Sequence, residues 1–352
     1  MTSIATQPSG QPAVAGGSAD ASDRLEEHRG ELTGYCYRML GSVFDAEDAV
    51  QDTMVRAWRS MDRFDGRSSL RTWIYRIATN VCLDLLAGRR RRALPMDLGP
   101  AAAPVAENLG DPLPELSSLE PIPDARVLPE RGDPADVAVA RESVRLAFVA
   151  ALQHLPPRQR AVLILREVLR WKADEVAELL DTTVASVNSA LQRARSTMAE
   201  ADRTLDLDPM DDDQRALLAR YVAAFESYDI DALVSLLHED ATQTMPPYEL
   251  WLRGAVDIGR WHLGPGIGCR GSRLVPVTAN GHPAFGSYRR SGPDGRLEPF
   301  SIQVIEVCAG RIARLTHFLD ARLFPVFGLP PGLEPGLEPG LEPDSDSVRP
   351  DV

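Results

Sequence analysis

The sequence predicts a multidomain protein in which two all-α domains are followed by one α+β domain. Apolar residues recur at helical spacing from Leu25 to Leu86 and from Val139 to about Ala201, and neither stretch shows a strand pattern. After residue 213, two helical stretches (214–227 and 230–238) precede strand-like segments separated by turn dipeptides. A chain of 352 residues is long enough for each unit to bury a core of its own.

Shifts in composition mark the boundaries between these units. Proline and acidic residues collect in the connecting stretches, and small residues collect at the N-terminus. The predicted segments are a disordered N-terminus (1–22), a first helical domain (23–92), an acidic proline-rich linker (93–138), a second helical domain (139–203), an acidic joint (204–213), the α+β domain (214–330) and a flexible tail with three Gly-Leu-Glu-Pro repeats (331–352).

The formal net charge of -13 is unevenly distributed. Residues 25–92 carry 12 arginines against 10 acidic residues, and residues 141–203 carry 10 basic against 8 acidic residues. The linker, the joint and the tail hold the acidic excess. Because nucleic-acid binding depends on local charge, the acidic total does not exclude DNA as a partner.

The four cysteines show no CxxC pair and no spacing typical of a zinc site. We therefore expect reduced thiols, no metal and no cofactor. The sequence contains no run of eighteen apolar residues and no charged-then-apolar leader. This favours a cytoplasmic protein with no membrane partner.

The stretch SSLRTWIYRIATN, residues 68–80, predicts a helix with an unusual outer face. Its two serines suit an N-cap, and its leucine, isoleucines and alanine form one apolar stripe. Arginines, aromatic residues and an amide lie on or beside the other faces. Because aromatic rings stack on unpaired bases and arginines bind phosphates, this face suits single-stranded nucleic acid. The alternative is an ordinary amphipathic helix with Trp73 in its core.

Residues 172–199 predict a helix-turn-helix. A first helix with an apolar face is interrupted by Asp181-Thr182-Thr183, and a second helix follows, with Val184, Val187, Leu191 and Ala194 pointing inward. The polar side chains of the second helix suit phosphates and base edges in a major groove. They are Thr183, Ser186, Asn188, Ser189, Gln192, Arg193 and Arg195. A plain helical hairpin with a polar outer face is the alternative.

Together, the two helical domains and the acidic linker resemble the extracytoplasmic-function group of the bacterial sigma-70 family, which lends promoter specificity to RNA polymerase. The segments that carry the resemblance are DAEDAVQDTMVRAW (45–58), RFDGRSSLRTWIYRIATNVCLDLL (63–86) and LPPRQRAVLILREVLRWKADEVAELLDTTVASVNSALQRAR (155–195). The resemblance implies that the first domain is sigma region 2, a helical bundle, and that the second is region 4. It also implies two partners, core RNA polymerase and promoter DNA.

For region 2 the resemblance implies two binding surfaces. The first would dock on the clamp of the polymerase largest subunit through Asp45, Glu47, Asp48, Gln51, Asp52 and Arg56, although such a charged face is often only solvated. The second, over 63–84, would capture the non-template strand of the minus-ten element through Arg63, Ser68, Arg71, Trp73, Tyr75, Arg76 and Asn80. Which of the two aromatic residues stacks on a base is left open.

For region 4 the resemblance implies contact with the polymerase flap, and reading of the minus-thirty-five element through residues 183–195. The four arginines 89–92 would bind backbone phosphates. The acidic linker would thread the polymerase cleft, where its charge imitates nucleic acid. A flexible tether would have the same composition.

Residues 214–327 resemble the SnoaL-like (polyketide-cyclase-like) fold, a cone of helices against a curved sheet. The turn signals Asn280-Gly281, Pro293-Asp294-Gly295 and Ala309-Gly310 separate its strands. In sigma factors that carry this domain, it is thought to tune activity in place of an anti-sigma protein. A pocket for a small ligand would be lined by Met245, Trp251, His262 and His317. No nucleophile or paired carboxylate stands at a telling spacing, so the sequence does not predict an enzyme.

The sequence therefore predicts an alternative sigma factor that is regulated by its own C-terminal domain. A ligand-responsive regulator that only binds duplex DNA is an alternative, but such a protein does not need residues 45–80. A cyclase-like enzyme with a DNA-binding appendage is a second alternative, and it would require turnover in the C-terminal pocket. Whether that domain activates, inhibits, binds a ligand or only stabilises the chain stays open.

Overall fold

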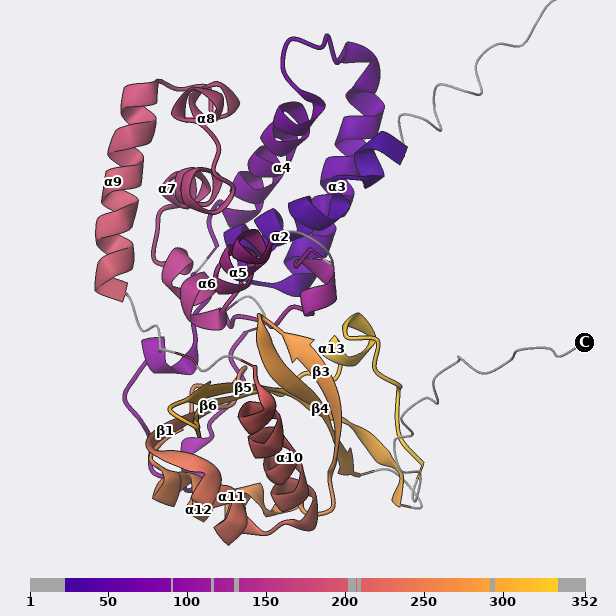
Figure 1. The fold of residues 1–352 in the computed structure, drawn as a ribbon, viewed down its shortest axis with the longest axis vertical. Helices are drawn as coiled ribbons and strands as arrows, with labels where there is room; N and C mark the ends of the chain where they lie inside the picture. The colour runs from indigo at the N-terminus through magenta and orange to yellow at the C-terminus, as the bar shows by residue number, and fades with distance from the viewer. Residues whose placement is uncertain are drawn as a thin grey trace, which may run out of the picture.

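The computed structural model describes residues 23–89, 91–114, 117–129, 133–201, 207, 210–291 and 295–334. The helical N-terminal part lies at the top of Figure 1, and the sheet with its covering helices lies below it. The predicted fold class is confirmed. The predicted disordered N-terminus, half of the acidic joint (204–206 and 208–209) and the tail beyond residue 334 lie outside the described residues. Within the described ranges, no helix is long and apolar enough to span a membrane.

The first helical domain consists of α2 (Arg29–Leu40), α3 (Val43–Ser60) and α4 (Leu70–Leu86). A serine caps each of the last two helices. The Ser42 hydroxyl accepts a hydrogen bond from the Asp45 amide at 3.1 Å, and the Ser69 hydroxyl accepts one from the Thr72 amide at 3.0 Å. The predicted N-cap of α4 is thereby confirmed.

The second helical domain consists of α5 (Pro134–Glu142), α6 (Leu146–Gln153), α7 (Pro157–Leu163), the π-helical turn η5 (Ile164–Val168), α8 (Ala173–Leu179) and α9 (Val184–Ala201). The last two helices form the predicted helix-turn-helix, and Asp181 in its turn has a left-handed φ of 49°. The buried face of α9 is formed by Val187, Leu191 and Ala194. Val184, also predicted to point inward, is 42% exposed because this first residue of the helix lies beside the turn.

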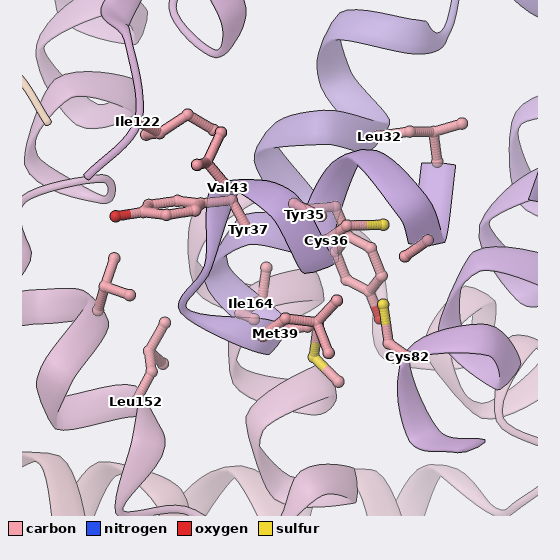
Figure 2. Packing of buried hydrophobic residues seen from close by; sticks show 14 of the residues in the cluster. Leu32, Tyr35, Cys36, Tyr37, Met39, Val43, Cys82, Ile122, Leu152 and Ile164 are labelled. Carbon is pink, nitrogen blue, oxygen red and sulfur yellow. The ribbon is translucent and has the colours of Figure 1, made fainter. Parts of the chain in front are cut away.

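The core is continuous between the two helical domains. Figure 2 shows Tyr37 of α2 near Ile122 of the linker and Leu152 of α6, and Tyr35 of α2 near Cys82 of α4. All five side chains are fully buried and belong to one cluster. Residues from distant parts of the sequence therefore share one apolar core.

The α+β domain combines a six-stranded sheet with three helices. The helices are α10 (Asp212–Ser227), α11 (Ile230–Leu236) and α12 (Ala255–Leu263), and the strands are β1 (Leu237–Thr244), β2 (Trp251–Arg253), β3 (Arg273–Ala279), β4 (His282–Arg290), β5 (Leu297–Cys308) and β6 (Arg311–Phe318). The strand order is β2-β1-β6-β5-β4-β3, and neighbours are antiparallel except β1 and β6. The turns predicted at Asn280-Gly281 and Ala309-Gly310 are confirmed. Pro293 and Asp294 of the third turn lie outside the described residues.

Both faces of this sheet are buried. Helices α10, α11 and α12 cover one face (Figure 1), where Phe225 and Ile305 share an apolar core. On the other face, Val304 belongs to the cluster that includes the helical domains. This two-sided burial explains why residues 301–307 of β5 are all buried instead of alternating.

The linker is irregular, as its prolines predict, but it is packed against the rest of the chain. Its short helical turns are η2 (Pro95–Asp97), η3 (Ala106–Asn108) and η4 (Asp124–Arg126). Leu94, Leu119 and Ile122 are buried in the shared core. A free tether would leave these apolar side chains in water, and their burial is the reason the linker is bound.

The C-terminal segment crosses the same face of the sheet as the helical domains. It forms α13 (Leu323–Val326), where the Phe324 ring packs on Tyr288 of β4 with ring centroids 5.0 Å apart. Farther on, Leu333 exchanges two backbone hydrogen bonds with Leu297, at 2.9 and 3.1 Å. The first residues of the predicted tail are therefore held to the sheet.

Candidate functional site

The structure divides the residues predicted to bind the minus-ten element into two groups. In the first group, Arg63 and Asn80 are exposed, and Ser68 and Trp73 are half-buried. The Trp73 ring packs on Phe64 with ring centroids 5.3 Å apart, so the loop before α4 lies against the helix. The side chains of this group are therefore at least partly open to solvent.

The second group faces the second helical domain. Tyr75 is fully buried, and its ring centroid lies 5.2 Å from that of Tyr35 and 5.0 Å from that of Trp171. Burial raises the pKa of Tyr75 well above its usual value, so its hydroxyl stays protonated. Trp73 is thus the more accessible of the two aromatic residues.

Two arginines of α4 also contact the second helical domain, with 39% and 41% of their side-chain surfaces exposed. Arg71 donates to Glu31 of α2 at 2.8 and 2.9 Å, and its guanidinium lies 5.1 Å from the ring centre of Trp171. Arg76 donates to the Glu178 carbonyl of α8 at 3.0 Å and lies 3.5 Å from the Glu178 carboxylate. One side of the predicted strand-binding face is therefore in contact with α8 and with Trp171 before it.

The residues predicted to bind the minus-thirty-five element form an exposed face of α9. All seven are exposed, namely Thr183, Ser186, Asn188, Ser189, Gln192, Arg193 and Arg195. The Thr183 hydroxyl caps the helix by accepting from the Ser186 amide at 3.2 Å. Arg195 also pairs with Glu167 at 2.6 Å, an exposed contact of small energetic value. This face is open to a DNA groove.

One end of the face predicted to dock on polymerase is engaged within the chain. Asp45 pairs with Arg89 at 2.9 Å and with Arg92 at 2.8 Å, both from the segment that follows α4. Glu47 pairs with Arg126 of η4. Two of the four arginines predicted to bind phosphates are therefore held by a carboxylate of α3.

The other end of this face is open. Asp48 and Gln51 are exposed on the surface of α3. Close to them along the helix, Asp52 and Arg56 form an ion pair at 2.7 Å. Trp58, which the sequence analysis did not single out, is 56% exposed. A large exposed aromatic side chain beside a charged face is typical of a protein interface. Its position outside the apolar stripe of α3 is the sequence signal that could have identified it.

One hairpin turn of the α+β domain contacts the linker and both helical domains. Asn280 is fully buried, and its Nδ2 donates to the Tyr37 hydroxyl of α2 and to the Val144 carbonyl before α6, each at 2.7 Å. Its Oδ1 accepts from the Ile122 amide of the linker at 3.0 Å. The sequence predicts this turn but carries no signal for its burial, because its partners lie in other domains.

Gly281 completes this contact. Its φ is 77°, and a β-carbon at this position would lie 2.5 Å from the side chain of Arg141. Its amide donates to the Asp124 carboxylate of the linker at 2.7 Å. Because the buried polar groups of the turn are paired, the two parts of the chain fit in one defined orientation.

The α+β domain contains a mostly apolar cavity of about 290 Å³ between the sheet and α12. Met245, His262 and His317, three of the four predicted pocket residues, line it. Trp251 does not, because it lies on the edge strand β2, where its indole Nε1 donates to the Gly99 carbonyl of the linker at 2.9 Å. Over the described ranges, no group of three or more potential ligands could hold a metal ion.

The titratable groups of this cavity that have shifted pKa values are uncharged near pH 7. Burial lowers the pKa of His262 to about 4 and that of His317 to about 3, so both imidazoles are neutral near pH 7. Burial raises the pKa of the Cys269 thiol, which is therefore a poor nucleophile. Among the described lining residues there is no carboxylate that could act as a general base.

Comparisons with known proteins assign the parts of the chain that carry these surfaces to known domain families. The Sigma-70 region 2 model matches residues 25–92, the Sigma-70 region 4 model matches residues 145–198, and the SnoaL-like domain model matches residues 218–315. The ECF RNA polymerase sigma factor SigG of Mycobacterium tuberculosis is 48% identical over 336 residues, which cover 93% of this chain and 89% of SigG. The chain belongs to the extracytoplasmic-function (ECF) sigma factors.

A second ECF sigma factor from the same organism, SigJ, is 30% identical over 307 residues, which cover 81% of this chain and 88% of SigJ. The crystal structure of Mycobacterium tuberculosis SigJ matches with a TM-score of 0.56 at 25% identity and covers 88% of this chain and 99% of that one. This ECF sigma factor thus contains region 2, region 4 and a SnoaL-like domain in that order, as the sequence predicts. Membership of the family supports a role in transcription initiation rather than in catalysis.

Sequence reasoning missed the residues that hold the regions of this sigma factor together. Trp171 and Glu178 of region 4 cover α4, and Asn280 joins the SnoaL-like domain to the rest of the chain. Each partner pair is remote in sequence, so local spacing gives no signal for these contacts.

Proposed function

We propose that this ECF sigma factor binds core RNA polymerase and directs initiation at a specific set of promoters, and that the conformation of Figure 1 is a closed, inactive form. The observation that carries the proposal is the cover on α4. Arg71 lies against Trp171 and Arg76 donates to Glu178, both of region 4. A single strand must reach this face to be bound, so region 4 has to leave it before promoter opening.

The proposed polymerase contact is consistent with such a closed form. The open end of α3, with Asp48, Gln51 and Trp58, is the surface that would dock first on the clamp of the largest subunit. Region 4 would contact the flap and present α9 to the minus-thirty-five element. Asp45 and Glu47 would exchange their partners within the chain for basic groups of the polymerase.

The proposed path of the linker through the polymerase cleft requires its release from the core. Ile122 of the linker and Val144 of region 4 are bound by the same side chain, that of Asn280. Loss of this one contact therefore weakens the attachment of the linker and of region 4 at the same time. We propose that the SnoaL-like domain holds the sigma factor closed through this hairpin.

Transcription in vitro with core polymerase tests this function. Full-length protein and the variant Asn280→Gly are compared on candidate promoters. Glycine keeps the left-handed backbone of the turn but removes three side-chain hydrogen bonds, each of which contributes about 0.5–1.5 kcal/mol. Both proteins should initiate at specific promoters. The variant should initiate about tenfold more often or better, since 1.4 kcal/mol changes an equilibrium tenfold.

The control is Ser291→Ala, which removes a 2.7 Å hydrogen bond to Glu298 inside the SnoaL-like domain and leaves the hairpin contact intact. It should initiate like the wild-type protein. Absence of binding to core polymerase by any of the proteins contradicts the proposed function. Equal initiation by Asn280→Gly and the wild type contradicts the closed form alone.

A further inference from the structure

One wall of the cavity in the SnoaL-like domain comes from the linker. Leu109, directly after η3, lines the cavity together with residues of the sheet and α12. Backbone hydrogen bonds hold the linker there. The Ala102 amide donates to the Trp251 carbonyl at 2.9 Å, and the Leu113 amide donates to the Pro247 carbonyl at 2.8 Å. The cavity is therefore complete only while the linker is bound to the domain.

Two buried histidines of the cavity wall have ring nitrogens without a hydrogen-bond partner. His262 is 3% exposed and His317 is 6% exposed. His262 Nε2 lies 3.2 Å from Gln243 Oε1, an atom that only accepts, so Nε2 carries the proton and Nδ1 is an acceptor. His262 Nδ1 and His317 Nε2 have no partner among the described residues. A ligand hydroxyl, which both donates and accepts, satisfies groups of this kind.

A cation lines the same cavity. Arg289 of β4 is half-buried, and its guanidinium lies 4.2 Å from the ring centre of Phe300, another lining residue. In the part of the chain that the structure describes, no carboxylate pairs with Arg289. The remaining wall is largely apolar and includes Met245 and Trp261. Apolar walls with a few convergent polar groups are the usual form of a small-molecule site.

We infer that this cavity binds a small aromatic carboxylic acid with a hydroxyl group at the end remote from the carboxylate. A flat ring suits apolar walls around about 290 Å³, close to the lower end of the roughly 300–1,000 Å³ range of ligand pockets. The hydroxyl lies at the end of the cavity lined by His262 and His317, each of which keeps an unpartnered ring nitrogen, and the carboxylate pairs with Arg289. No bond of the ligand is broken in this site.

The inference rests on the proposed function in one respect, because it assigns a ligand to the closed form. A ring in the cavity contacts Leu109 only while the linker is bound. The acid therefore binds the closed form more tightly than a form whose linker has left, and it shifts the population toward the closed form. Its effect on transcription is repression.

Calorimetric titration of the full-length protein with 4-hydroxybenzoate tests the site. The expected result is binding, with at least tenfold weaker binding of benzoate, which lacks the hydroxyl, and of 4-hydroxybenzamide, which lacks the charge. Arg289→Gln weakens binding of 4-hydroxybenzoate at least tenfold, and Arg289→Lys, which keeps the charge, restores most of it. Arg290→Gln is the matched control, because Arg290 is exposed and does not line the cavity.

Two outcomes overturn the assigned ligand class. One is the absence of binding of 4-hydroxybenzoate at ligand concentrations up to about 1 mM, because a dissociation constant above this value means only weak affinity. The other is equal binding by Arg289→Gln and the wild-type protein, provided that both show the same thermal unfolding. Neither measurement needs polymerase, so failure of the proposed function leaves this test intact.

Hydrogen exchange of residues 99–113 tests the coupling to the linker. Addition of 4-hydroxybenzoate should slow hydrogen exchange in this segment. At the same ligand concentration it should also lower the rate of transcription initiation in vitro. With Leu109→Ala, the slowing should be lost. Binding of 4-hydroxybenzoate without any change of exchange in the linker overturns the coupling. Slowed exchange together with unchanged initiation contradicts the closed form as the inactive state.

Discussion

Single side chains on α4 suit two different partners. Arg71 and Tyr75 have the chemistry that single-stranded DNA requires, a cation beside an aromatic ring. In the closed form the same chemistry is satisfied by Trp171, whose ring lies 5.1 Å from the Arg71 guanidinium and 5.0 Å from the Tyr75 ring. Region 4 and the promoter strand therefore compete for one face of region 2 in the proposed mechanism.

Trp73 is the residue with which the open part of this face can be tested. Trp73→Ala is expected to reduce open-complex formation more than duplex binding, because stacking on one base contributes about 1–3 kcal/mol. Permanganate reactivity of the minus-ten region reports opening, and a gel-shift titration on the closed duplex reports binding. Trp73→Phe keeps a ring and should retain most of the activity. A Trp73→Ala protein that has lost its cooperative unfolding would instead assign this residue to the core.

Three buried histidines predict how stability depends on pH. Burial lowers the pKa of His262 and His282 to about 4 and that of His317 to about 3, whereas an unfolded histidine titrates near 6.5. The unfolded state therefore binds more protons below pH 6.5. The contribution of these neutral histidines to the free energy of unfolding is therefore complete above pH 6.5. It is lost as the pH falls toward 4, by up to about 1.4 kcal/mol for each histidine and each pH unit.

Thermal unfolding at pH 7.5 and pH 5.5 provides the measurement for this prediction. The SnoaL-like domain should unfold at a lower temperature at the lower pH, and His317→Gln should make the difference smaller. An unfolding temperature that is the same at both values would show that these rings are not buried in the neutral form.

At the scale of elements, local chemistry explains how much of the fold could be predicted. Ser69 caps α4 and Asn280-Gly281 forms a hairpin because each depends on neighbours within a few residues. The exposed face of α9 also follows from spacing alone. The burial of Tyr75 and of the linker residue Ile122 could not be predicted, since both depend on partners in other domains.

Helix α9 carries a prediction about promoter selection. Gln192→Ala and Arg193→Ala should each weaken preference for the minus-thirty-five element, by about 1–3 kcal/mol for every base contact that is lost. The measurement is competition between promoters that differ only in this element. Arg158→Ala, an exposed arginine outside α9, serves as the control. Unchanged selectivity in both α9 variants would mean that another surface reads this element.

In the proposed closed form, the described parts of the three domains share one packed core. One apolar cluster extends from region 2 through region 4 to the outer face of the sheet, and Asn280 joins the same parts through hydrogen bonds. Because region 2, region 4 and the linker contact one hairpin, their release is expected to be cooperative. In the proposed mechanism, the SnoaL-like domain regulates the sigma factor through these contacts and needs no catalytic step.

Removal of the SnoaL-like domain should shift the equilibrium between the proposed closed form and an open form more than any single substitution. A version ending at residue 205 lacks the hairpin and the cavity, so Ile122 and Val144 lose the side chain that binds them both. We expect it to initiate at the same promoters as the full chain and at a higher rate at equal concentration. In vitro transcription with core polymerase measures this, and circular dichroism verifies that the helices of both regions persist. If a folded truncation that binds polymerase initiates at a lower rate than the full chain, the domain activates the factor. The closed form would then be an intermediate in promoter binding and not an inactive state.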